Sequence, residues 1–485
     1  MPEIVLLNPI SDPKRISFRV APWALLHVAC GLKKNGFSVS IIDQNVELGW
    51  KKRLKEIGHD TLFVGVTAMS GVQIKYGLEM TRAAKEILDV PIVWGGPHAT
   101  LFPKQTIAHE LIDYVVTGEG EEAASDIAMM LKEGRQCDIA GVWQKKDGKI
   151  SCGNKRGFVR IEDYMNLPYE LIDLERYIYS TPYSKRTFEL CTSRGCPHAC
   201  GFCYNLAVNK RKWRAASADK VTSQLQYLAE TFKIDGVNFR EDNFFVDRTR
   251  VEAICKEIIQ RGLKLKWHCD ARVDYFDNFD DEFIELLKNA GCSQVTFGVE
   301  SGSKKVLGIM QKGITKEQAL RVNMKMRKHK IQCMYHFSFG YPGETSEDAK
   351  ETVMLARKLL TENPSSGIWK PSVFTPYPGT PLYDISKSLG LKVPEDLKGF
   401  ADYEWTTSHL PWLGKEEAKK LYATIYLMSG YASKIPMIGR WFKYRFEKLQ
   451  KQDTKYIPEK IFTDLAEKAI FTYRLALKKM TQMRY

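Results

Sequence analysis

Short apolar runs alternate with helix-patterned stretches along the first 130 or so residues of the chain. The runs are rich in β-branched residues, and we expect strands at residues 4–7, 39–42, 62–66, 90–94 and 114–116. Between the first two runs, apolar residues recur at helical spacing from Trp23 to Leu32. Continuous apolar strands separated by amphipathic helices are typical of a parallel sheet covered on both faces. We therefore predict an α/β protein with a doubly wound, Rossmann-like N-terminal domain.

Small and polar residues follow these strands, at the sheet edge where such folds bind ligands. They are Asn8 after the first strand, Thr67, Ala68, Met69 and Ser70 after the third, Gly95, Gly96, Pro97 and His98 after the fourth, and Gly118, Glu119 and Gly120 after the fifth. Glycines let a backbone approach a large ligand, but tight turns need them too. The pattern alone leaves both roles open. No G-x-G-x-x-G follows the first strand, which argues against a dinucleotide site.

The strand and helix alternation resumes after residue 187. Strands are expected at residues 188–191, 236–239, 264–269, 294–299, 332–339 and 368–374. Six strand–helix units predict a partial (β/α)6 barrel of the TIM type, with its chemistry on the loops that follow the strands. The connector between the two alternating regions contains an expected hairpin at residues 142–150, with a turn signal at Asp147-Gly148.

Three cysteines, Cys196, Cys200 and Cys203, follow one another with the spacing C-x3-C-x2-C. This spacing suits one loop that wraps three corners of a 4Fe-4S cluster and leaves the fourth iron free to bind a substrate. Structural zinc, scattered core cysteines and a two-cysteine redox site are the alternatives. Zinc usually takes four ligands, and although His198 or Cys191 could complete a set, both crowd against the three cysteines.

The cysteine motif, with the aromatic Phe202 before its last ligand, resembles the signature of the radical S-adenosylmethionine (SAM) superfamily. Preceded by a doubly wound domain with G-G-P-H and G-E-G-E turns, it resembles the cobalamin-binding class of that superfamily. This class includes cobalamin-dependent methyltransferases and the anaerobic magnesium-protoporphyrin monomethyl ester cyclase group. The resemblance implies four regions: a cobalamin-binding domain at 1–135, a connector at 136–187, a radical SAM core at 188–390 and a helical, basic C-terminal domain at 391–485.

The resemblance also implies the cofactors, which are a 4Fe-4S cluster, SAM and cobalamin. Cys196, Cys200 and Cys203 would hold the cluster. Residues implied for SAM are Phe202, Glu241, Asp242, Arg272, Glu300 and Ser301, although carboxylates after strands can instead cap the next helix. The polar turns of the first domain would hold cobalamin. No D-x-H-x-x-G motif is present, so no histidine is expected to ligate cobalt; His98 is expected in the pocket wall, and Met69 and Ser70 near the lower face.

The implied reaction is reductive cleavage of SAM to a 5′-deoxyadenosyl radical that activates a substrate C–H bond, followed by methyl transfer from methylcobalamin to carbon. No side chain is expected to act as a nucleophile or other catalytic group. Oxidative cyclisation or another rearrangement of the cyclase type is the nearest alternative. A tRNA methylthiotransferase is not expected, because such enzymes carry three further cysteines in the first domain, where this chain has only Cys30 and Cys137.

The formal net charge is +14, and the stretch 431–485, with 13 Lys or Arg against 5 Asp or Glu, carries +8 of it. Two apolar stripes at helical spacing run through this tail, one from Trp441 to Leu449 and one from Ile461 to Leu477. A helical cap on the barrel is the first interpretation. The alternative is a basic amphipathic surface that rests on the inner face of a membrane and recruits a lipid-like substrate.

The remaining expectations concern partners and location. No segment has the roughly 18 uncharged apolar residues that span a bilayer, and the N-terminus does not read as a secretion signal. The 11 cysteines then fit a reducing cytoplasm. We expect a small-molecule or lipid-like substrate and a low-potential electron donor such as ferredoxin or flavodoxin. Nucleic acid is not expected as a partner, because no base-reading motif accompanies the basic tail.

Overall fold

The computed structural model describes residues 2–12, 20–58, 60–135, 137–146, 148–401 and 410–414, with 417, 418, 421, 424, 425 and 428. The helices expected between residues 441 and 477 lie outside the described residues. The chain divides into two compact units. The first comprises Met1–Gly195, Ala207–Ile234 and Lys392–Ser408, and the second comprises Cys196–Leu206, Asp235–Leu391 and His409–Tyr485.

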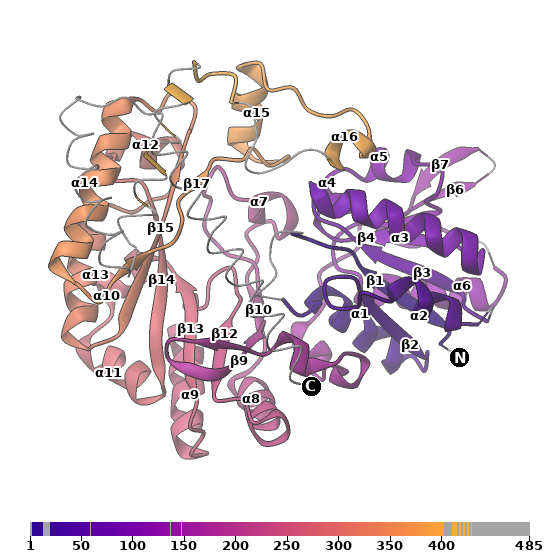
Figure 1. The fold of residues 1–485 in the computed structure, drawn as a ribbon, viewed down its shortest axis with the longest axis horizontal. Helices are drawn as coiled ribbons and strands as arrows, with labels where there is room; N and C mark the ends of the chain where they lie inside the picture. Colours follow the sequence, from indigo (N-terminus) through magenta and orange to yellow (C-terminus); the bar gives the residue numbers. More distant parts are fainter. Residues whose placement is uncertain are drawn as a thin grey trace. The chain divides into compact units, whose positions relative to one another are not determined.

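The first unit contains a seven-stranded sheet in the order β2-β1-β3-β4-β5-β6-β7 (Figure 1). Its parallel strands are β1 (Ile4–Asn8), β2 (Val39–Asp43), β3 (Phe63–Thr67), β4 (Ile92–Gly95) and β5 (Tyr114–Val116). The antiparallel hairpin β6 (Val142–Lys146) and β7 (Lys149–Cys152) extends the sheet beyond β5. All five expected strands and the expected hairpin are confirmed, each within two residues of its predicted ends.

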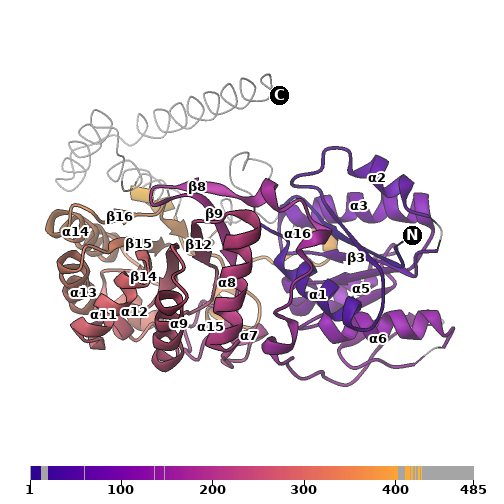
Figure 2. The ribbon, with the colours of Figure 1, turned by 90° about the horizontal axis from the view of Figure 1, so that it is seen from below.

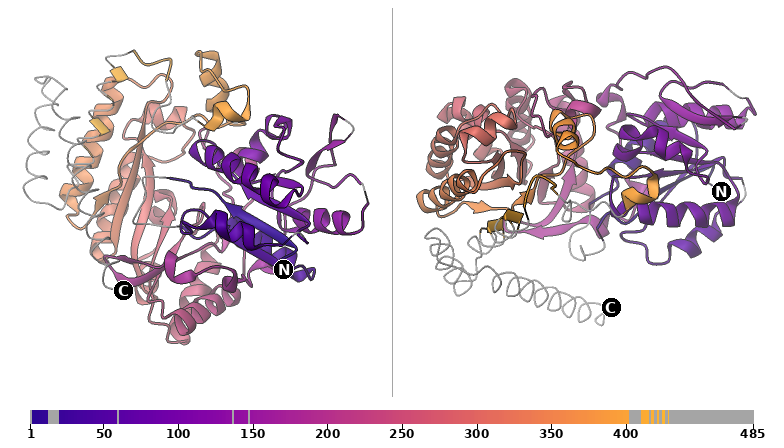
Figure 3. Two further views of the ribbon diagram at one scale, coloured as in Figure 1. Left: turned by 45° about the vertical axis from the view of Figure 1, so that its right-hand side comes forward. Right: turned by 90° about the horizontal axis from the view of Figure 1, so that it is seen from above.

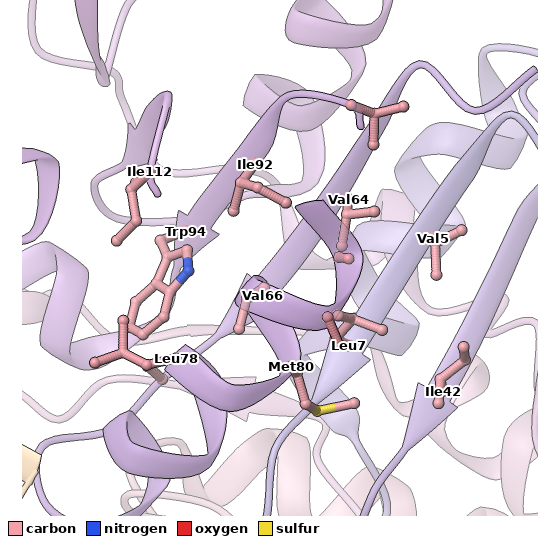
Figure 4. Close-up of a cluster of buried hydrophobic side chains, with 14 of the residues drawn as sticks. Val5, Leu7, Ile42, Val64, Val66, Leu78, Met80, Ile92, Trp94 and Ile112 are labelled. Atoms are coloured by element: carbon pink, nitrogen blue, oxygen red, sulfur yellow. The ribbon is translucent and has the colours of Figure 1, made fainter. Parts of the chain in front are cut away.

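Helices cover both faces of this sheet, as continuous apolar strands require. They are α1 (Trp23–Lys34), α2 (Trp50–Glu56), α3 (Val72–Leu88), α4 (Pro97–Leu101), α5 (Pro103–Ala108) and α6 (Glu121–Lys132). Figure 2 shows α2 and α3 on one side of the strands and α1 and α6 on the other. On the α3 side, Trp94 of β4 and Val66 of β3 pack with Leu78 and Met80 of α3 in one buried cluster (Figure 4).

The connector and the chain that follows it add short elements to the first unit. They are the 3-10 helices η1 (Ile161–Tyr164), η2 (Tyr169–Leu171) and η3 (Leu174–Tyr177), the antiparallel pairs β8 (Tyr179–Thr181) with β9 (Ser184–Leu190) and β10 (Ser193–Arg194) with β11 (Arg214–Ala215), and helix α8 (Ala218–Phe232). The β10 and β11 pair matters for the site, because the chain between these two strands carries the cysteine motif.

The described end of the chain differs from the expected separate domain at 391–485. Helix α16 (Leu397–Ala401) packs on α3 of the first unit, and Leu397 and Phe400 are buried in its core. The Phe400 carbonyl accepts a 3.1 Å hydrogen bond from the Gly71 backbone amide. The segment returns to the first unit because two apolar side chains three residues apart on a short helix can bury together only against another apolar surface.

The second unit contains parallel strands in the order β12-β13-β14-β15-β16, curled as a partial barrel. They are β12 (Gly236–Phe239), β13 (Lys266–Ala271), β14 (Cys292–Glu300), β15 (Gln332–Phe339) and β16 (Gly367–Ile368), with β17 (Ser372–Val373) also pairing with β15. The strand expected at residues 368–374 is therefore two short strands. Three residues between them carry no strand pairing, which divides the predicted run.

Helices cover the outer face of this curled sheet (Figures 1 and 3). They are α9 (Arg248–Gln260), α10 (Val273–Asn278), α11 (Asp281–Asn289), α13 (Lys316–Lys328) and α14 (Ser346–Glu362). The side chains that face them are large and apolar; Phe297 of β14, for example, packs edge-on against Phe276 of α10 with 5.0 Å between ring centroids. The unit also contains the helices α12 (Lys304–Ile309) and α15 (Pro381–Ser388). In the described part of the chain, no helix combines the length and apolar character needed to cross a membrane.

Candidate functional site

The three motif cysteines lie in the second unit on the loop that precedes α7 (Asn205–Val208). A hydrogen bond of 3.0 Å from the Cys203 amide to the Cys200 carbonyl closes a turn between the last two cysteines. The Gly201 amide donates to the carbonyl of Met310 over 2.7 Å, which attaches this turn to the end of α12. The loop is thus held by backbone bonds, and its side chains remain available to bind a metal.

The surroundings of the cysteines fit a metal cluster. Asn243 Nδ2 donates to the sulfur of Cys196 over 3.7 Å, and Arg272 Nη1 donates to the sulfur of Cys200 over 3.5 Å. Burial raises the pKa of Cys203 to about 11. A buried thiol of this kind loses its proton when metal binds, and donors to sulfur then stabilise the thiolate.

The zinc alternative needs several side chains to converge on one ion. Among the described residues, no group of three or more His, Cys, Asp or Glu side chains does so. His198, one of the two candidates for a fourth zinc ligand, shares a 2.9 Å hydrogen bond with the hydroxyl of Tyr275 instead. In a cubane cluster each cysteine binds its own iron, so the sulfurs need not meet at one point.

Glu300 ends β14 within a buried group of charges. Lys312 Nζ lies 3.2 Å from its Oε1 and His336 Nδ1 lies 3.1 Å from its Oε2. Burial alone would raise the pKa of Glu300, but Lys312 and His336 lower it to about 2. Its backbone is left-handed, with φ of 66°, a conformation that a glutamate adopts only where the surrounding structure enforces it. The carboxylate is therefore held ionised in a defined place.

Arg272 lies between this charged group and the cluster loop. Its guanidinium donates to the carbonyl of Lys312 over 2.7 Å, in addition to its bond to the sulfur of Cys200. It also donates from Nε and Nη2 to the two carboxylate oxygens of Asp274. The Lys312 ammonium also lies 5.6 Å from the ring centroid of Phe202. Three residues expected at SAM, Phe202, Arg272 and Glu300, thus meet around Lys312.

The other three expected SAM residues lie differently. Asp242 accepts a 2.9 Å hydrogen bond from the Tyr204 hydroxyl, and Glu241 is buried. Ser301 is completely buried; its hydroxyl shares a 2.9 Å hydrogen bond with Thr352 and accepts a 3.1 Å bond from the amide of Ser303, the N-cap of α12. Sequence reasoning missed Lys312, whose position twelve residues after Glu300 has no motif to mark it.

The first unit brings together two of the turns expected at cobalamin. The Ala68 amide donates to the Gly95 carbonyl over 3.1 Å, and the His98 amide donates to the Ala68 carbonyl over 3.0 Å. Gly96 has φ of 93°, and a Cβ there would lie 2.8 Å from the hydroxyl of Thr67, so the two turns require glycine to approach this closely. Met69 projects from this junction, with 43% of its surface exposed.

The remaining cobalamin candidates lie on either side of this junction. Asn8 is buried at the end of β1, and the Gly118 amide donates to the hydroxyl of Thr100 over 3.0 Å. Gly118 is exposed with φ of 82°. Its neighbour Glu119 forms ion pairs with Arg194 and Arg214.

His98 is completely buried. Its Nδ1 shares a 2.9 Å hydrogen bond with the Ser70 hydroxyl, and its ring lies 5.3 Å from that of Phe102 and 4.9 Å from that of Phe400. Burial lowers the pKa of His98 to about 4, so the ring is neutral at pH 7. Its role is to connect the Ser70 turn to the returning helix α16.

We expect the Phe400→Ala substitution to weaken the binding of hydroxocobalamin. The Phe400 ring covers His98, and its backbone accepts from Gly71 in the turn that carries Met69. Loss of a buried phenylalanine typically costs about 3–5 kcal/mol of stability, and the loosened turn should raise the dissociation constant. Absorption titration of the full-length protein checks this. Leu389→Ala, an exposed leucine in the second unit, is the control; equal affinity in the two variants would contradict the prediction.

Comparison with known protein families finds matches in two parts of the chain. Residues 15–128 match the family described as B12 binding domain, and residues 190–356 match the Radical SAM superfamily. The chain is a radical SAM protein with a B12-binding domain. The predicted fold class and the resemblance to the cobalamin-binding radical SAM class are thereby confirmed.

Relatives of this radical SAM protein include methyltransferases and cyclases. An uncharacterized methyltransferase of Pyrococcus horikoshii is 28% identical over 88% of this chain and 92% of its own length. The anaerobic magnesium-protoporphyrin IX monomethyl ester cyclase of Rubrivivax gelatinosus is 26% identical over 71% of this chain, which spans 61% of that enzyme. The structure of the radical SAM methyltransferase TsrM from Kitasatospora setae shares the fold, with 21% identity, a TM-score of 0.66, and coverage of 81% of this chain and 76% of TsrM.

Proposed function

We propose that this radical SAM protein is a cobalamin-dependent methyltransferase that adds a methyl group to a carbon atom of a small molecule. The observation that carries the proposal is the presence of a B12-binding domain and a radical SAM domain in one chain. The similarity to the methyltransferase relative from Pyrococcus horikoshii covers 88% of this chain and 92% of the relative, so it is not confined to one of the two matched domains. Bound together, the cluster, SAM and cobalamin supply a hydrogen-abstracting radical and a methyl donor.

The protein's own residues would bind and orient these groups. The thiolates of Cys196, Cys200 and Cys203 hold the cluster, with Arg272 donating to one of its sulfur ligands. Glu300, kept ionised by Lys312, accepts hydrogen bonds from a bound ammonium or hydroxyl group. None of these residues needs to act as a nucleophile. An external low-potential donor such as ferredoxin or flavodoxin would supply the electron.

The inner face of the partial barrel favours a substrate with polar groups. On that face Asp270 of β13, Thr296 of β14 and Met334 of β15 are register neighbours. Thr296 Oγ1 shares a 2.8 Å hydrogen bond with His268 and accepts a 3.1 Å bond from the indole of Trp369. Barrel interiors are usually filled by branched apolar side chains. Hydrogen-bonding groups in their place are suited to a polar small molecule more than to a lipid-like chain.

Oxidative cyclisation is the second candidate, because the cyclase of Rubrivivax gelatinosus is also a relative. The two reactions consume SAM differently. Methyl transfer uses one SAM molecule for the radical and a second to remethylate cobalamin, so it produces 5′-deoxyadenosine and S-adenosylhomocysteine together. Cyclisation needs no methyl group and adds none to the product.

The test is anaerobic reconstitution with iron, sulfide and hydroxocobalamin, followed by incubation with a reductant, methyl-deuterated SAM and a small-molecule extract of cells as the substrate source. We expect retained corrinoid, both SAM-derived products, and a new compound heavier by one labelled methyl group in place of hydrogen. Products that lose hydrogen or gain oxygen, without S-adenosylhomocysteine, would favour the cyclase. Failure to retain any corrinoid would refute the proposed function.

A further inference from the structure

The chain that carries the cysteine motif begins and ends in a two-stranded ribbon. Strand β10 pairs antiparallel with β11, and Arg194 lies directly opposite Arg214 in this pair. The three cysteines lie between these strands in sequence, and both strands belong to the first unit. Two like charges directly opposite each other destabilise a strand pair. The ribbon therefore needs a negative charge beside the two arginines.

Glu119 supplies that charge. Its Oε1 accepts a hydrogen bond from Nη1 of Arg194 and another from Nη1 of Arg214, each of 2.7 Å. Its Oε2 accepts from Arg214 Nη1 over 2.8 Å and from the backbone amide of Val159 over 2.8 Å. The Glu119 side chain is only 10% exposed. Charge-assisted bonds shielded from water in this way are stronger than those of a surface pair.

Other contacts fix the direction of each guanidinium. Glu121 Oε1 accepts from Arg194 Nη2 over 2.6 Å, and Asn209 Oδ1 accepts from Arg214 Nη2 over 2.9 Å. The Arg214 guanidinium also lies 4.1 Å from the ring centroid of Phe158. Glu121 and Asn209 each accept from one of the two arginines in these bonds, whereas Glu119 accepts from both. Glu119 thus joins the two strands of the ribbon through side chains.

We propose that Glu119 is a positioning residue for the cluster, contributed by the B12-binding domain. Its carboxylate holds together the two strands from which the cysteine loop extends. Fixing both ends of a loop lowers the conformational entropy that the loop must lose when it binds a ligand. The three thiols are thereby arranged for the cluster before iron enters. This inference rests on the proposed function, because it takes the cysteines to be cluster ligands.

The test compares the wild-type protein with Glu119→Gln and Glu122→Gln, each full-length and reconstituted anaerobically. Glutamine keeps the size of the side chain but leaves the two arginines without a shared counter-charge. Glu122 is the matched control, because it pairs with Arg156 and contacts neither ribbon arginine in the ion pairs of the structure. Iron transfer to a chelator should be about 10-fold faster from Glu119→Gln than from the wild type. This factor is the lower end of the effect that loss of a group orienting metal ligands usually has. The control should resemble the wild type.

A second measurement does not depend on the cluster. Hydrogen exchange of the backbone amides of residues 191–216 in the iron-free protein should be faster in Glu119→Gln than in the wild type, whereas amides of the barrel strands should be unchanged. Faster exchange that is confined to residues 191–216 also distinguishes a loosened ribbon from a variant that fails to fold. In the double variant Glu119→Gln/Arg214→Gln one of the two like charges is removed, and slower exchange and slower iron loss than in Glu119→Gln are expected.

The outcomes separate the two proposals. Wild-type rates of both iron loss and exchange in Glu119→Gln would overturn the role of Glu119, as would a double variant no better than the single one. A wild-type protein that assembles no iron–sulfur cluster would overturn the proposed function instead. In that case the exchange measurement alone decides whether Glu119 holds the ribbon closed.

Discussion

Protein in which Cys196, Cys200 and Cys203 are all replaced by alanine will retain no iron–sulfur cluster and will not cleave SAM. Each thiolate binds one iron of the cluster, and alanine offers no ligand in its place. Loss of SAM cleavage should be complete, because the cluster is the source of the electron that breaks the sulfonium bond. Iron and sulfide analysis, Mössbauer spectra and assay of 5′-deoxyadenosine check the prediction.

The control for this variant is the Cys137→Ala/Cys152→Ala protein, which lacks two exposed cysteines of the first unit. It should keep the cluster and its activity, because neither thiol lies in the motif. The same cluster content in the triple variant as in this control would show that the motif cysteines are not the ligands. Loss of iron from the control would show that cysteine number, not position, governs reconstitution.

Replacing Glu300 with glutamine is expected to have the second largest effect. The substitution leaves the buried ammonium of Lys312 without its carboxylate partner, and breaking a buried pair costs about 3–5 kcal/mol of folding stability. SAM binding should weaken about 10- to 100-fold, the loss expected for a hydrogen bond to a charged group. Thermal unfolding and equilibrium dialysis with labelled SAM measure the two effects separately.

The double variant Glu300→Gln/Lys312→Met separates stability from ligand binding. Removing both charges eliminates the unpaired ammonium, so most of the lost stability should return, whereas SAM binding should stay weak. Recovery of SAM affinity along with stability would contradict a direct role for Glu300.

Acid provides a further check: the pKa of Glu300 is lowered to about 2 in the folded protein, from about 4.3 in a free chain. The stabilisation that ionised Glu300 contributes to folding is therefore fully present above a pH of about 4.3. It is lost as the pH falls through the folded-state pKa of about 2, which unfolding measured as a function of pH would show.

The spacing of apolar residues predicted the fold, because each strand and each helix has its own pattern of apolar positions within a few residues of the chain. The β3 strand was expected from the apolar run at residues 62–66, and the structure places it at Phe63–Thr67. Its parallel neighbours followed from the helices between them, since parallel strands need a crossover. The cysteine motif was equally local, because three ligands within eight residues can be read without knowing the fold. The return of helix α16 to the first unit was not predicted, because it depends on two segments far apart in the chain.

The amino-acid sequence by itself determined the order of strands and helices, the presence of a doubly wound domain and a partial barrel, and the spacing of the three motif cysteines. Only the tertiary structure decided that His98 is buried under Phe400, that Lys312 neutralises Glu300, and that Glu119 joins Arg194 to Arg214. The physical reason is the separation along the chain over which each kind of interaction acts. Hydrophobic period and ligand spacing act over a few residues, whereas an ion pair or a buried ring depends on which side chains, up to 302 residues apart in the case of His98 and Phe400, reach the same place in the folded chain.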